Sequence, residues 1–208
     1  MSIEKAYNVW AEQYDSNENK TRDLDKITAI EILSNYNFEN VLELGCGTGK
    51  NTKWLLEKAK KIIGLDFSQE MLNKAKEKIN NAKVTFIKAN LSQPWKVDNE
   101  FVDLITSSLM LEHIKDLDFI FKQAYLKLKP SGIFFINELH PFKQYSGSKA
   151  RYESENGIEV LEVYTHHISE YLISAKNNGF ILIEIQEQFD NEDENEIPRL
   201  ISFVFKKN

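Results

Sequence analysis

The sequence predicts an α/β fold with a doubly wound, mostly parallel sheet. Short apolar runs alternate with helical patterns over residues 41–138, which is the order of parallel strands joined by crossover helices. A glycine-rich turn at residues 45–49 joins the first apolar run to a helical pattern, and ligands of open α/β sheets bind at such strand ends. The last two apolar runs, 180–189 and 199–207, are separated by a short acidic segment, which indicates an antiparallel pair.

The first four strands are predicted by four short apolar runs. These runs are "VLEL" (41–44), "KIIGLD" (61–66), "KVTFIKA" (83–89) and "FVDLITSS" (101–108). A helical pattern through Trp54, Leu55 and Ala59 follows the first run, and a second pattern begins at Ser68. The second pattern places four apolar residues on one face, at helical spacing: Met71, Leu72, Ala75 and Ile79.

The second half of the chain continues this alternation and adds an insertion. Residues 117–129 carry an apolar stripe at helical spacing, "KPSG" ends that helix, and 133–138 predicts the fifth strand. A polar and aromatic insertion follows at 139–167, and then a helix over about 168–178. With the two closing runs the predicted sheet has seven strands, of which the last is antiparallel.

Composition and charge argue against several classes of protein. The net charge is −6, and lysines are interspersed with acidic residues at helical spacing, so we expect no nucleic-acid-binding face. No apolar run approaches the roughly 18 residues of a membrane span, and "MSIEKAYNVW" has no apolar signal region. The single cysteine, Cys46, excludes an internal disulfide and a cysteine-cluster metal site. We expect a cytoplasmic protein that binds no membrane and no metal.

The loop "GCGTG" (45–49) is compatible with three kinds of nucleotide site, which its neighbours distinguish. A Walker loop needs glycine where Leu44 stands and a hydroxyl where Asn51 stands. The dinucleotide fingerprint needs a third glycine where Lys50 stands. The loop is instead G-x-G-x-G, and the next strand ends in Asp66. A carboxylate there can accept hydrogen bonds from both ribose hydroxyls of an adenosine, and it would repel a 2′-phosphate.

Four segments in order resemble the motifs of one enzyme family. They are "VLELGCGTGKNT", "IIGLDFSQEML", "FVDLITSSLMLEHI" and "LKPSGIFFINELHPF". Together they resemble class I S-adenosylmethionine-dependent methyltransferases, most closely the small-molecule branch with ubiquinone, biotin-pathway and trans-aconitate methyltransferases. The resemblance covers residues 5–140, and it implies a Rossmann-like seven-stranded fold with S-adenosylmethionine as cofactor and S-adenosylhomocysteine as product. One departure is Asn90, where the family usually has an aspartate that contacts adenine.

The resemblance also implies roles for particular residues. The cofactor site that it implies consists of Glu43, Gly45, Cys46, Gly47, Thr48, Gly49, Asp66, Phe67, Met71, Asn90, Leu91 and Ser107. His113 and His140, which follow the fourth and fifth strands, are the catalytic candidates, as a general base or as contacts to the methyl acceptor. Contacts to the acceptor are also expected from Tyr14, Tyr145 and His166. For Met71, its place on an apolar stripe predicts core packing equally well.

We expect a single domain over residues 1–208, with two parts outside the sheet. Residues 1–37 are expected to form an N-terminal helical lid, and the insertion at 139–167 is expected to cover the acceptor pocket. The expected reaction is methyl transfer to an oxygen, nitrogen or carbon of a small molecule. The sequence leaves open a tRNA or protein methyltransferase and a non-catalytic S-adenosylmethionine-binding protein. It also leaves open the identity of the acceptor, and whether the chain is a monomer or a homodimer.

Overall fold

The computed structural model describes residues 3–148, 151–154, 157–161 and 163–208. The nine strands of this part of the chain are β1 (Asn40–Leu44), β2 (Lys61–Asp66), β3 (Val84–Lys88), β4 (Val102–Ser108), β5 (Leu128–Leu139), β6 (Arg151–Ser154), β7 (Gly157–Val160), β8 (Phe180–Gln188) and β9 (Leu200–Lys207). The helices are α1 (Ile3–Trp10), α2 (Lys20–Ser34), α3 (Lys50–Leu55), α4 (Gln69–Lys78), η1 (Leu111–His113), α5 (Leu117–Lys127), α6 (Pro141–Tyr145), α7 (Ile168–Asn177) and η2 (Asp190–Glu192).

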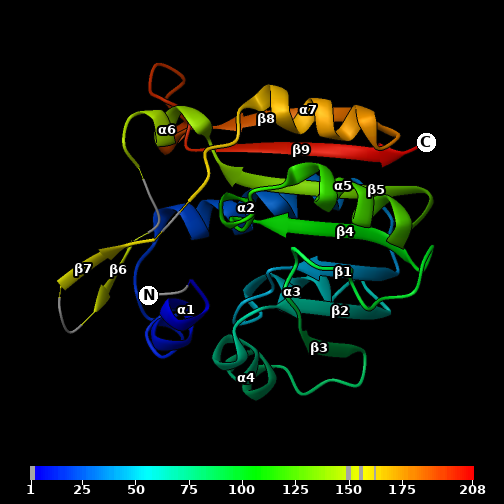
Figure 1. Cartoon of the computed structure of the whole chain (residues 1–208), viewed down its shortest axis with the longest axis horizontal. Helices are drawn as coiled ribbons and strands as arrows, with labels where there is room; N and C mark the ends of the chain where they lie inside the picture. Colours follow the sequence, from blue (N-terminus) through cyan, green and yellow to red (C-terminus); the bar gives the residue numbers. More distant parts are fainter. Residues whose placement is uncertain (1–2, 149–150, 155–156, 162) are drawn as a thin grey trace.

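Seven of the strands form one sheet in the order β3-β2-β1-β4-β5-β9-β8 (Figure 1). The first five strands of this order pair in parallel, whereas β9 is antiparallel to both of its neighbours. The predicted α/β fold, a mostly parallel seven-stranded sheet with an antiparallel last strand, is therefore confirmed. The antiparallel pair follows from the short connection between β8 and β9, which cannot accommodate a crossover helix.

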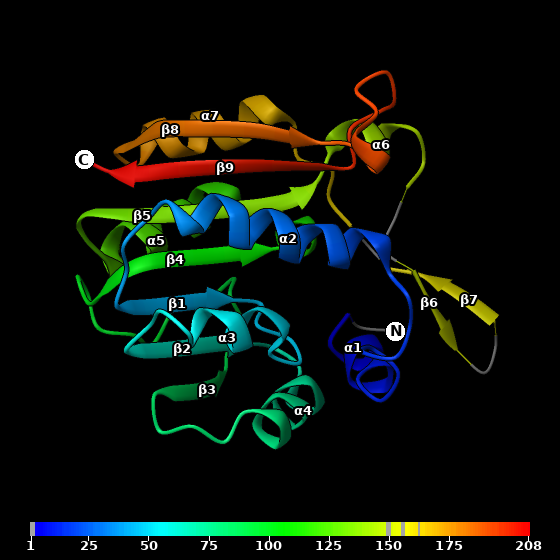
Figure 2. The same ribbon diagram turned by 180° about the vertical axis from the view of Figure 1, so that it is seen from behind.

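Helices cover both faces of the sheet, with α2 and α3 on one face and α5 and α7 on the other (Figures 1 and 2). Each inner strand is apolar on both faces because successive side chains point to opposite sides. In β5, Phe134 packs in the core under α5 and α7, while Phe135 packs in the core under α2 and α3. In β9, Phe203 and Val204 divide in the same way.

The start of β5 differs from its prediction. The helix α5 ends at Lys127 as "KPSG" indicates, but the strand begins at Leu128 rather than at residue 133. The register against β4 shifts between Val102 and Leu104, and Ser131 adopts a left-handed backbone with φ of 64°. The four residues thus form a bulge within the strand, because Leu128 pairs with Val102 and the next paired residue of β5 is Ile133, opposite Leu104.

The insertion at 139–167 contains the short helix α6 and the antiparallel hairpin β6–β7. The hairpin projects away from the main sheet, on the side where α1 lies (Figures 1 and 2). The sequence indicated that this segment lies outside the sheet, and the hairpin itself was not predicted. No helix in the described part of the chain has the length and apolarity needed to cross a membrane.

The first helix and the turn after it, residues 3–17 (the α1 segment), lie against α4. Three ion pairs join this segment to lysines of α4 and β3: Lys74–Glu12 (2.9 Å), Lys78–Asp15 (2.5 Å) and Lys88–Glu4 (2.8 Å). The side chain of Asn8 also accepts a hydrogen bond from the Ser68 hydroxyl at 2.7 Å. These contacts hold the α1 segment next to the carboxyl ends of β2 and β3.

Candidate active site

The glycine loop occupies the carboxyl end of β1 and has a backbone that few other residues could adopt. Gly45, Gly47 and Gly49 have φ values of 65°, 51° and 80°, in the left-handed region that glycine populates without strain. A Cβ atom on Gly45 would lie 2.5 Å from the Cγ atom of Met110. A Cβ atom on Gly47 would meet nothing within 4 Å, so the backbone at Gly47 is open to a ligand.

Glu43 lies at the end of β1 and is buried beneath the loop. Its carboxylate accepts a hydrogen bond from the Thr52 hydroxyl of α3 at 2.5 Å. Burial raises the pKa of Glu43 to about 8. The Glu43–Thr52 hydrogen bond joins β1 to α3 on either side of the loop, as expected of a residue that orients it.

Asp66 ends β2 and holds the same loop from the other side. Its carboxylate accepts hydrogen bonds from the backbone N–H groups of Gly47 and Ser68, both at 2.8 Å. Burial raises the pKa of Asp66 to about 6. Ser68 is the N-cap of α4 and accepts from the Met71 N–H, so the carboxylate also lies at a helix N-terminus, which favours its charged form.

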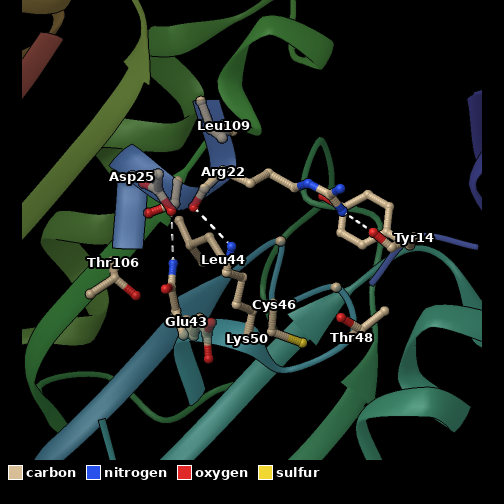
Figure 3. Close-up of a pocket in the computed structure, with 14 residues that line it drawn as sticks. Tyr14, Arg22, Asp25, Glu43, Leu44, Cys46, Thr48, Lys50, Thr106 and Leu109 are labelled. Carbon is tan, nitrogen blue, oxygen red and sulfur yellow. Dashed lines mark hydrogen bonds between the residues drawn. The ribbon is translucent and has the colours of Figure 1, made fainter. Parts of the chain in front are cut away.

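A small cavity of about 60 Å³, the loop cavity, opens between the glycine loop and the N-terminal end of α2 (Figure 3). Among its lining residues are Tyr14, Arg22, Asp25, Glu43, Gly45, Cys46, Gly47, Thr48 and Leu109. The Arg22 guanidinium donates to the carbonyl oxygens of Tyr14 and Asn17 and lies 4.2 Å from the Tyr14 ring centroid. The Nε atom of Arg22 is buried and has no hydrogen-bond partner. A residue that lines this cavity therefore carries an unsatisfied hydrogen-bond donor.

A second cavity of about 480 Å³, the edge cavity, lies beyond β2 and β3 on the other side of Gly45. Its lining includes Phe67, Asn90, Leu91, Met110 and His113. The side-chain oxygen of Asn90 accepts from the Ser92 N–H at 2.9 Å. Gly45 lines both cavities, so one extended ligand could lie across the glycine loop from the first cavity into the second.

A third cavity of about 470 Å³, the lid cavity, lies between the α1 segment, the start of α2 and the insertion. It shares Tyr14, Arg22 and Leu109 with the loop cavity. The insertion contributes Leu139 and Ser148 to its lining. The lid cavity therefore adjoins the loop cavity and is bounded by both parts that we expected to lie near the acceptor.

The loop between β4 and α5 is held in place by Glu138. This fully buried carboxylate accepts from the backbone N–H groups of Met110 (3.0 Å) and Leu111 (2.9 Å), and burial raises its pKa to about 8. The same loop carries Glu112, which lines the lid cavity, and His113, which lines the edge cavity. Glu138 thus acts as a positioning residue for two polar side chains that face different cavities.

Of the predicted catalytic and acceptor-binding residues, the structure brings His113 and Tyr14 to the cavities. The Nε2 atom of His113 shares a hydrogen bond of 2.8 Å with the Tyr7 hydroxyl, and Tyr7 lines the lid cavity. His140, Tyr145 and His166 line none of the three cavities.

These three residues have other partners in the structure. His140 is buried, caps α6 by accepting from the Phe142 N–H, and lies 2.8 Å from Glu187. Tyr145 is exposed and shares a hydrogen bond with His167. His166 is buried and shares a hydrogen bond with the Ile114 carbonyl. Their predicted roles stay predictions.

Four predicted cofactor residues, Asp66 among them, line none of the three cavities. Met71 is buried on the apolar stripe of α4, Ser107 is fully buried near the Glu138 carboxylate, and Gly49 is the N-cap of α3. Sequence reasoning missed Arg22 and Glu112. Glu112 stood in a recognised motif next to His113, whereas nothing in the helical pattern of residues 20–34 distinguished Arg22.

Comparisons with known proteins agree with this geometry. The profile of a methyltransferase domain matches residues 42–136, which contain the glycine loop, Asp66 and His113. This part of the chain is therefore similar to a methyltransferase domain. Phosphoethanolamine N-methyltransferase 1 of Triticum aestivum is 32% identical over 64% of this chain and 28% of its own length. Malonyl-[acyl-carrier protein] O-methyltransferase of Priestia megaterium is 30% identical over 62% of this chain and 48% of its own.

The chain thus spans less than half the length of these two relatives. Among solved structures, a putative S-adenosylmethionine-dependent methyltransferase from Listeria monocytogenes superposes with a TM-score of 0.77 at 23% identity, covering 91% of this chain and all of its own. This likeness shows that the chain shares the fold of that structure.

Proposed function

We propose that this protein is a methyltransferase that binds S-adenosylmethionine across the glycine loop and transfers its methyl group to a small molecule bound in the lid cavity. The observation that carries this proposal is the wall of Tyr14, Arg22 and Leu109 that the loop and lid cavities share. Because these residues line both cavities, the cavities adjoin there, and a molecule in the lid cavity would lie next to one in the loop cavity. Such juxtaposition is the main requirement for an in-line transfer, because orientation alone supplies roughly 7–11 kcal/mol.

The residues present suit the cofactor. Gly45 lines both the loop cavity and the edge cavity, so a ligand would cross the loop there, and Asp66 offers a buried carboxylate to the ribose hydroxyls. Phe67 and Asn90 line the edge cavity, which would take the adenine. The unpartnered Nε atom of Arg22 supplies a cationic donor for the carboxylate of the methionine part. Bound in this way, S-adenosylmethionine supplies an electrophilic methyl group.

The protein's own contribution is to orient the acceptor and, for an acceptor that loses a proton, to receive that proton. We propose His113 as this base. Its Nε2 atom is hydrogen-bonded to the hydroxyl of Tyr7, a residue that lines the lid cavity. Tyr7 would take the proton of the acceptor while passing its own hydroxyl proton to Nε2 of His113. The α1 segment covers the site and keeps water away from the reacting groups.

Two measurements test the function. The protein is incubated with S-adenosylmethionine carrying a tritiated methyl group and an unfractionated cell extract, and we expect label in the small-molecule fraction. If protein or tRNA carries the label instead, the acceptor is not a small molecule and the proposed acceptor class is wrong. If the cofactor binds but nothing is labelled, the protein is a non-catalytic binding protein.

Calorimetry with S-adenosylhomocysteine tests the cofactor site directly. Arg22→Gln should weaken binding roughly 10- to 100-fold, because a charge-assisted hydrogen bond contributes about 1.5–3 kcal/mol. The matched control is Lys20→Gln, since Lys20 is an exposed cation two residues away that does not line the loop cavity. Equal affinities for both variants would remove Arg22 from the cofactor site.

A further inference from the structure

We infer that the lid cavity recognises a methyl acceptor that carries an ammonium group, held by Glu112 and by a wall of three aromatic rings. This inference rests on the proposed function, because it concerns the acceptor side of the same site. The cavity is lined by Tyr7, Trp10 and Tyr14 from the α1 segment and by Glu112 from the loop after β4.

Glu112 is a largely buried carboxylate without a strong cationic partner. Its side chain is 13% exposed, and its carboxylate accepts one hydrogen bond, from the Gln144 amide at 3.1 Å. The nearest basic atom is Nε2 of His113 at 4.0 Å, and that atom already shares a hydrogen bond with Tyr7. Within the described residues, no lysine or arginine forms an ion pair with Glu112.

A ligand cation in the lid cavity would compensate this carboxylate. Burial raises the pKa of Glu112 above its ordinary value, because a charge taken out of water is costly without an opposite charge nearby. An ammonium group that enters the cavity restores that opposite charge. The Gln144 amide of α6 donates to this carboxylate and so restricts its position, and Glu112 lines the cavity.

The aromatic wall favours the same kind of ligand. The ring centroids of Tyr7 and Trp10 are 5.6 Å apart, and those of Trp10 and Tyr14 are 5.0 Å apart. Clustered aromatic faces attract cations, and ammonium ligands are bound in this way. The Tyr14 ring already carries one cation, the Arg22 guanidinium, at 4.2 Å.

The basic residues that also line the cavity do not make it an anion site. Arg199 is neutralised by Asp190, which accepts from both its Nε and Nη2 atoms, and its Nη1 atom donates to Thr21. Lys20 is exposed. Arg22 also lines the loop cavity, where we assign it to the cofactor. Glu112 is the largely buried carboxylate of this lining, and it forms no ion pair with a lysine or arginine of the described residues.

Three probes of the same shape and different charge test this inference. Choline is a cation, 3,3-dimethylbutan-1-ol is its neutral carbon isostere, and 3,3-dimethylbutanoate is a related anion. Their binding to the full chain is measured by calorimetry, with and without S-adenosylhomocysteine. We expect choline to bind at least 10-fold more tightly than either of the other two probes.

Variants then locate the preference. Glu112→Gln should lower the affinity for choline at least 10-fold while leaving the neutral probe within 2-fold. Glu18→Gln, which removes an exposed carboxylate at the same cavity, should change neither. If circular dichroism shows that Glu112→Gln fails to fold, the Trp10→Leu variant is used in its place. It should weaken the binding of choline more than the binding of the neutral probe.

The inference is overturned if the neutral or anionic probe binds as tightly as choline, if no probe binds, or if the variants keep the parent's preference. Failure of the proposed function looks different. In that case S-adenosylhomocysteine would not bind, while the preference for choline could still be measured on the protein alone.

Discussion

Replacing Asp66 by asparagine isolates the charge of the carboxylate at the end of β2, because the two side chains have the same shape. The Asp66 carboxylate accepts from Gly47 and Ser68 and is proposed to accept from the ribose as well. An amide offers one oxygen and turns an NH2 group against one of these donors. Since a hydrogen bond to a charged group contributes about 1.5–3 kcal/mol, Asp66→Asn should weaken S-adenosylhomocysteine binding roughly 10- to 100-fold.

The affinity for S-adenosylhomocysteine should also depend on pH in a way that identifies Asp66. The pKa of Asp66 is about 6, and the ribose hydroxyls donate to the ionised form. In the parent protein, affinity should be constant above pH 7 and should fall about 10-fold per pH unit below pH 6. In Asp66→Asn this fall should be absent, because the amide does not titrate.

Calorimetry with S-adenosylhomocysteine between pH 5 and pH 8 measures both effects. The control is Asp23→Asn, since Asp23 is an exposed carboxylate that pairs with Lys50 and should affect neither affinity nor its pH dependence. A parent affinity that stays flat from pH 5 to pH 8, or an Asp66→Asn variant that binds like the parent, would refute the reasoning. Asp66 would then only hold the glycine loop and the start of α4.

Two further predictions concern stability and the α1 segment. The pKa of Glu43 is raised to about 8 in the folded protein against 4.5 ordinarily, so its contribution to stability is complete below pH 4.5 and is lost as the pH rises through 8. In the parent protein, the free energy of unfolding should fall between pH 4.5 and pH 8, by up to about 1.4 kcal/mol per pH unit from this residue. In Glu43→Gln, denaturant unfolding should show a smaller fall over the same pH range. An equal fall in the parent and the variant would contradict the raised pKa. Replacing both Lys74 and Lys78 by glutamine, or adding 1 M salt, should speed S-adenosylhomocysteine release up to about 10-fold in stopped flow, since each exposed ion pair contributes about 0–1 kcal/mol. Lys76→Gln, on the same helix but in no ion pair within the described residues, is the control, and an equal effect from it would exclude the ion pairs as the cause.

Local sequence patterns were sufficient to predict the main sheet. The range of β2 was predicted as residues 61–66, and the structure has it there. Ser68 was predicted to start the next helix and is its N-cap. Such features depend on neighbouring residues: an apolar run, a polar strand end and a side chain that caps the first turn. The glycine loop belongs to the same class, because its backbone conformation is set within five residues.

Features that depend on distant partners were not predictable. The early start of β5 arises because Leu128 pairs with Val102 of β4, and this pairing leaves no trace in the sequence around "KPSG". The importance of Arg22 comes from the cavity that it meets near Gly45, and that of Glu112 from the aromatic side chains of the α1 segment. Burial and proximity of this kind appear only when the chain is folded.

The wall of Tyr14, Arg22 and Leu109 has a consequence for kinetics. Because these residues line both the loop cavity and the lid cavity, the two cavities adjoin, and a bound cofactor would complete one side of the acceptor's binding site. Turnover should therefore follow a compulsory order in which S-adenosylmethionine binds first and S-adenosylhomocysteine leaves last. The α1 segment would open once per cycle to exchange the cofactor, and it would open a second time, by a smaller movement, to admit the acceptor. Exchange of spent cofactor, rather than methyl transfer itself, would then limit the rate at high acceptor concentration.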